Sequence, residues 1–183
     1  EDMTPAVEDH HQDLRARWTF DDDFKNSSSL GDRNDAVPVN DPSIVAEGIS
    51  GGAVRFHATK EQFLTVPRSF LDDNSAAHSV SLWFKAESLP EHGSTQRALL
   101  LESTAEGRPS NVSAWNLSLG LRTAPNANDI NLQLFTHTLQ PALKPEMAPT
   151  AISQGPFDTW VARERLLEEW NHVVFTFDSK SLH

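Results

Sequence analysis

Apolar and polar residues alternate in several short segments of this chain. The clearest segments are Trp115–Leu121 and Ile130–Phe135, where apolar residues occupy every second position. His78–Ala86 shows the same pattern, although Trp83 stands among its polar positions. Because successive side chains of a strand point to opposite faces, this period predicts half-buried β-strands.

Further short apolar runs, bounded by polar turns, predict more strands. They are Arg17–Phe20, Ala53–Phe56, Gln62–Val66, Arg97–Glu102 and Asn171–Asp178. The polar stretch Pro125–Asp129 has the composition of a hairpin loop. Lys25–Asn40 is rich in Ser, Asn and Asp, and Gln140–Pro156 contains four prolines, so we expect both to be irregular.

One segment supports two interpretations. Trp160–Trp170 contains Ala, Arg, Leu and Glu residues that suit a helix. The short strands on either side favour strand and turn instead, because tertiary context overrides local propensity. Both interpretations stay open from the sequence alone.

These elements predict an all-β fold, a two-sheet antiparallel sandwich. The length of 183 residues suits one domain, and five Trp and ten Phe side chains could anchor its core. Residues 1–15 are polar without a period, so we interpret them as a lead-in or linker. The domain itself is expected over residues 16–183.

Composition narrows the function classes. The formal net charge is −11, which disfavours binding to the phosphates of nucleic acids or to anionic lipid surfaces. No cysteine is present, so disulfides and thiolate chemistry are excluded. No segment approaches the roughly 20 apolar residues of a membrane span, and we expect no membrane insertion. Since the first residue is Glu1, we expect the chain to be a piece of a longer protein.

The sequence also lacks the motifs of several enzyme classes. Retaining glycosidases need two carboxyl groups about 5 Å apart, as E-x-D-x-E on one strand provides, and no such motif occurs. The eight histidines form no H-E-x-x-H motif, and no serine lies in G-x-S-x-G. We therefore predict that the chain is not an enzyme.

The acidic run at Asp21, Asp22 and Asp23 is the best candidate for a metal site. Carboxylates beside loop carbonyls are the oxygen ligands that Ca²⁺ prefers, and Asp35 from the following loop could complete the set. The alternative is a solvated strand end with turn-forming Asp residues.

Sugar binding requires an exposed aromatic platform with planar polar groups around it. Trp115 and Trp160, which lie next to predicted loops, are the candidates. The alternative for each is packing in the core or at its rim, since Trp is highly buried on average.

Four segments, in this order, carry a family resemblance. They are W-T-F-D at 18–21, G-I-S-G-G-A-V-R-F at 48–56, S-V-S-L-W-F-K at 79–85 and E-W-N-H-V-V-F-T-F-D at 169–178. Together they resemble the laminin G-like domains of the concanavalin A-like lectin and glucanase superfamily. The resemblance implies a jelly-roll sandwich, and it also implies a structural calcium ion near the first strand.

The chain departs from this family pattern at its end. In the family, further strands follow the last motif and close both sheets, whereas this chain stops at His183. We therefore expect a jelly roll that lacks its last strands.

The resemblance implies a non-catalytic binding module of a larger secreted, periplasmic or cell-surface protein. Such a module would recognise glycan or protein through its rim loops. The alternative is a structural spacer that packs against neighbouring domains of the parent chain. A third hypothesis, a glycan hydrolase, is disfavoured because the E-x-D-x-E carboxylate motif is missing.

Overall fold

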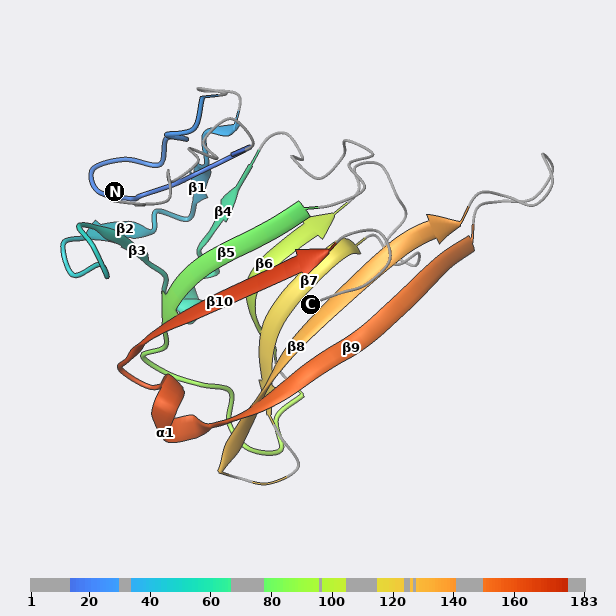
Figure 1. Cartoon of the computed structure of the whole chain (residues 1–183). Helices are drawn as coiled ribbons and strands as arrows, with labels where there is room; N and C mark the ends of the chain where they lie inside the picture. Colours follow the sequence, from blue (N-terminus) through green and yellow to red (C-terminus); the bar gives the residue numbers. More distant parts are fainter. Residues whose placement is uncertain are drawn as a thin grey trace, which may run out of the picture. The chain divides into compact units, whose positions relative to one another are not determined.

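The structure is a computed structural model that describes residues 14–29, 34–66, 78–95, 97–104, 115–123, 126, 128–140 and 150–177. Within these ranges almost all of the regular secondary structure is β-strand (Figure 1). It divides into two compact units, one containing β1 to β4 and the other containing β5 to β10 with the helix α1. Each unit is described below by itself.

The first unit contains two small antiparallel strand pairs. β1 (Val37–Val39) pairs with β4 (Phe63–Thr65), and β2 (Ser43–Val45) pairs with β3 (Ala53–Arg55). A 3-10 turn, Ala58–Lys60, lies shortly before β4. Strands of three residues form few hydrogen bonds with their partners. Hydrogen bonds between side chains and the backbone therefore help to stabilise this unit.

The segment before β1 is extended but forms no strand. Trp18 and Phe20 are half-buried while Arg17 and Thr19 are exposed, so the predicted alternation holds. Phe20, however, adopts a left-handed backbone with φ of 57°, which ends any regular extension at this position. The predicted strand at 17–20 is therefore wrong. Its groups bond to loops instead, as when the Trp18 indole N–H donates to the Asn34 carbonyl at 2.9 Å.

The second unit is dominated by a four-stranded antiparallel sheet (Figure 1). Its strands follow one another in chain order: β6 (Arg97–Thr104), β7 (Trp115–Thr123), β8 (Asp129–Gln140) and β9 (Thr150–Ala162). Alternating Leu and Ile residues in β7 and β8 favour this pairing, because their apolar side chains gather on one face.

The second unit also contains a strand pair, β5 (His78–Lys85) with β10 (Trp170–Phe177). The Glu168 N–H donates to the Ala86 carbonyl at 3.0 Å, so the end of β5 lies beside the segment that leads into β10. Ala86 also forms an isolated bridge with Leu167 at this point.

The core of the second unit lies between these two layers. Leu121 of β7, Ile130 of β8 and Leu166 of α1 (Arg163–Leu166) form a buried cluster, and Phe84 of β5 packs against it. The unit is therefore sandwich-like. The helix α1 is a single turn, and the Arg163 N–H fixes it to the Asn128 carbonyl at 2.9 Å.

Most predicted strands are confirmed, as is the all-β antiparallel class. Two expectations about irregular segments are wrong: β1 lies within 25–40, and β9 covers residues 150–156. The segment 160–170 contains both predicted states, because Trp160 to Ala162 end β9 and α1 follows at once. The single domain over 16–183 and the jelly-roll strand order stay predictions, and residues 1–13 and 178–183 lie outside the described ranges.

Candidate functional site

The face of the four-stranded sheet that points away from the core is polar. In β7 the core face holds Leu119 and Leu121, so Gly120 and Arg122 belong to the opposite face. The strand register then aligns one residue from each strand across this face: Arg97 opposite Arg122, Arg122 opposite Asn131, and Asn131 opposite Trp160. We name this set, Arg97, Arg122, Asn131 and Trp160, the cross-strand row.

The cross-strand row combines exposed and buried members. The Trp160 side chain is 48% exposed, and Arg122 is also exposed. Asn131, between them, is 6% exposed, and Gln133 two residues further along β8 is 5% exposed. Two buried planar amides thus lie beside an exposed indole and an exposed guanidinium.

Arg97 lies flat on this face. Its guanidinium donates to the Gln133 carbonyl at 3.2 Å, which carries the side chain from β6 across β7 to β8. A Cβ atom at Gly120 would come within 2.8 Å of the Arg97 Nε atom. Position 120 must therefore be glycine for Arg97 to cross the sheet.

Glu102 shares the polar face with Arg97. Glu102 pairs with Ser118, beyond a register shift between Leu99 and Leu101. This shift places Glu102 on the same face of the sheet as Arg97. Burial raises the pKa of Glu102, and the charge of Arg97 partly offsets this increase. Burial also lowers the pKa of Arg97, with the nearby Arg122 charge acting in the same direction.

The raised pKa of Glu102 predicts a pH effect on stability. The folded chain holds this proton more tightly than the unfolded chain, so stability increases as pH falls through the raised pKa toward 4.5. We expect the free energy of unfolding of the wild type to rise relative to Glu102→Gln as pH falls from 7 to 4, measured by chemical denaturation.

Asp21→Asn provides the control of opposite sign. The Gly52 N–H bond is the main reason why the pKa of Asp21 lies below 3.8. The wild type must therefore lose stability relative to Asp21→Asn below pH about 4. Equal pH profiles for the wild type and Glu102→Gln would contradict the assignment of Glu102.

The structure separates the two predicted sugar-binding residues. Trp160 belongs to the cross-strand row near the end of β9, within a strand rather than a loop. Trp115 begins β7, and its side chain is not among those described. Sequence reasoning missed Arg97, Arg122, Asn131 and Gln133. The available signal was that the latter three occupy polar positions in or beside the alternating runs.

Asp21 connects two distant segments of the first unit. Its Oδ1 atom accepts the Gly52 N–H at 2.9 Å. The bond joins the acidic run to the glycine turn at 48–52. This is a structural role for the first predicted calcium ligand.

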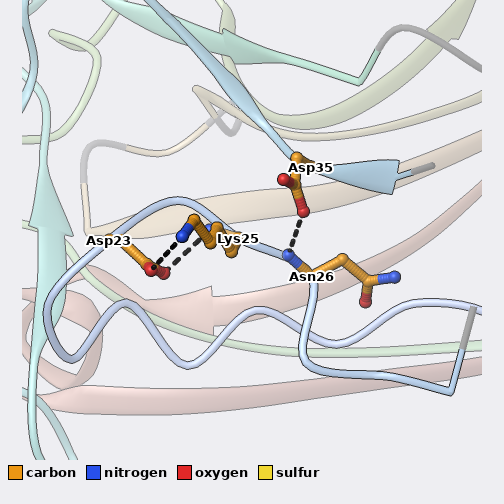
Figure 2. A network of polar contacts seen from close by, with 4 residues as sticks. All are labelled: Asp23, Lys25, Asn26 and Asp35. Atoms are coloured by element: carbon orange, nitrogen blue, oxygen red, sulfur yellow. Dashed lines mark hydrogen bonds and ion pairs between the residues drawn. The ribbon is translucent and has the colours of Figure 1, made fainter. Parts of the chain in front are cut away.

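Two of the other predicted calcium ligands, Asp23 and Asp35, also make local contacts (Figure 2). Asp23 accepts the Lys25 backbone N–H at 2.9 Å and approaches its ammonium at 3.8 Å, while Asp35 accepts the Asn26 N–H at 2.8 Å. Asp22 is exposed. In the described part of the chain, no three Asp, Glu or His side chains are grouped to hold a metal ion. The arrangement favours the turn-forming alternative, and calcium binding stays a prediction.

A second polar cluster lies on the outer face of the β5–β10 pair. Ser81 Oγ and His172 Nε2 are 2.8 Å apart, and the Trp83 ring stacks on the imidazole with centroids 4.4 Å apart. One ring face of His172 is thus covered by Trp83. The cluster joins the two strands, and its geometry indicates a cross-strand structural contact.

Comparisons with protein-family models, curated proteins and solved structures found no match to this chain. The fold and the polar face therefore define the class on their own: an all-β protein with a sandwich-like unit and a mixed aromatic and polar sheet surface. The resemblance to laminin G-like domains stays a prediction from the motifs. Among the residues described, no helix combines the length and apolar character needed to cross a bilayer.

Proposed function

We propose that this chain is a non-catalytic glycan-binding module, of the jelly-roll sandwich kind, within a larger extracytoplasmic protein. The observation that supports it is the half-exposed Trp160, aligned with Asn131 and Arg122 across the polar sheet face. The proposal places the binding surface on the sheet, in place of the rim loops expected from the sequence.

The proposed surface is chemically complementary to a sugar. The C–H face of a pyranose ring stacks on an indole, and its hydroxyl groups bond to planar amides and guanidinium groups. Trp160 of β9 would supply the stacking platform. Arg122 of β7, two strands away, would supply hydrogen-bond donors. The non-catalytic assignment rests on the absence of the E-x-D-x-E motif. A structural calcium ion is also part of the proposal.

The test uses two tryptophans with equal exposure. Trp160 and Trp83 are each 48% exposed, but they belong to different sheets. We expect Trp160→Ala to weaken binding at least about tenfold in a glycan array and a polysaccharide pull-down, because the stacking platform is lost. Trp83→Ala should bind as the wild type does.

Two results would count against this proposal. One is unchanged binding by Trp160→Ala. The other is a wild-type chain that retains no glycan, with and without calcium. The second result would favour a structural spacer domain, for which there is a separate observation: Trp83 and Val174, 48% and 52% exposed, both lie on the β5–β10 pair.

A further inference from the structure

The cross-strand row contains two arginines in directly opposite positions. Arg97 of β6 faces Arg122 of β7 in the antiparallel register. Like charges directly opposite each other destabilise a sheet. Their proximity is notable in a chain with a net charge of −11, whose 26 acidic residues outnumber 15 basic ones.

The two arginines have different roles. Arg97 is engaged in contacts within the protein, since it donates a hydrogen bond to the Gln133 carbonyl and lies near the Glu102 charge. Arg122 is exposed, and among the described side chains it forms no ion pair. Arg122 is therefore the cation of the row that is available to a ligand.

The spacing of the row relates Arg122 to Trp160. Both are aligned with Asn131, so two strand spacings separate them, which is about 10 Å. A sugar stacked on Trp160 would place the next sugar of a chain toward Arg122. The ligand would then cross the strands along the row.

We propose that the glycan bound here carries carboxylate groups, and that Arg122 binds one of them. This inference rests on the proposed glycan-binding function and names its substrate class. A guanidinium matches a carboxylate with two parallel hydrogen bonds, whereas a neutral sugar leaves its charge uncompensated. A carboxylate at this position would also offset the repulsion between Arg97 and Arg122.

The experiment compares a polyuronate with its own methyl ester. Polygalacturonate oligosaccharides and their fully methyl-esterified forms share a backbone and differ in charge. We expect the wild type to bind the free acid about tenfold more tightly than the ester in calorimetric titration, and this preference should weaken with added salt. Arg122→Ala should remove the preference, because it weakens binding of the free acid much more than binding of the ester.

The control variant removes an equivalent charge elsewhere. Arg165 of α1 is also exposed, and Arg165→Ala should keep the preference for the free acid. Arg122→Lys should keep only part of it, because an ammonium cannot form the two parallel bonds. Circular dichroism confirms that each variant is folded.

The outcomes distinguish this inference from the function on which it rests. Equal binding of acid and ester, with loss of both in Trp160→Ala, would overturn the carboxylate inference and keep the glycan-binding function. A preference that persists in Arg122→Ala would overturn it too, as would tighter binding of a sulfated glucan than of the polyuronate. No binding of any glycan would instead overturn the proposed function.

Discussion

Ile130→Ala is expected to lower the free energy of unfolding of the second unit by about 3 kcal/mol, from the cost of removing buried methyl groups and leaving a cavity. The Ile130 side chain is fully buried, and it lies in the cluster with Leu121 and Leu166. Its cross-strand partner Val161 also packs against this cluster. Urea denaturation followed by Trp fluorescence measures the loss.

Val174→Ala is the matched control for this change. Val174 also lies in a strand of the second unit, but its side chain is 52% exposed. Its truncation leaves no cavity, so we expect a change within about 0.5 kcal/mol. Losses of similar size for the two variants would contradict the placement of the core.

Gly52→Ala is expected to destabilise the first unit by about 3 kcal/mol, because it combines overpacking with the loss of a hydrogen bond. A Cβ atom at Gly52 would collide with the Phe20 carbonyl oxygen and approach the Asp21 Cα atom to 2.8 Å. Both are backbone atoms, so the segment before β1 must move. The bond from the Gly52 N–H to Asp21 would then be broken.

Hydrogen exchange locates this effect within the chain. Peptides from 14–29 and 48–56 should exchange faster in Gly52→Ala, while peptides from β6 to β9 should keep their rates. Gly93→Ala is the control, since Gly93 has a φ of 79° but a Cβ atom there would meet no atom within 4 Å. It should cost only the backbone strain of about 1 kcal/mol. Equal exchange at 14–29 in Gly52→Ala and the wild type would contradict the contact.

Alternation was the most reliable sequence signal for the fold. Trp115–Leu121 and Ile130–Phe135 predicted β7 and β8 because one face of each strand is buried in a core. β9 was missed because it follows a proline-containing stretch and its apolar residues alternate weakly. The strand predicted at 17–20 fails for a different reason: the left-handed Phe20 ends the extension, and no partner strand pairs with it.

The candidate site could be predicted only in part. Alternation separates Arg122 from Leu121 and Asn131 from Ile130, and so it defines two faces in each strand. It does not say which residues of neighbouring strands lie opposite each other. Register supplies that information, and only register brings Trp160 into line with Asn131 and Arg122.

For the acidic run at Asp21, Asp22 and Asp23, too, the sequence does not show which distant residues lie close by. The sequence singled out Asp21 as a calcium ligand, which stays a prediction, and the structure shows this carboxylate in a hydrogen bond. Its partner is the Gly52 N–H, 31 residues away in the sequence. No local pattern encodes that pairing, because it depends on how the glycine turn meets the segment before β1.

The most direct test of the proposed glycan-binding surface is a nuclear magnetic resonance titration of the indole N–H signals. The chain has five tryptophans, and the signal that disappears in Trp160→Phe identifies Trp160. Adding polygalacturonate oligosaccharides should shift the Trp160 signal and leave the Trp83 signal in place. A titration in which Trp160 does not move, or in which Trp83 moves instead, would contradict the assignment of the binding surface to the polar face of the four-stranded sheet.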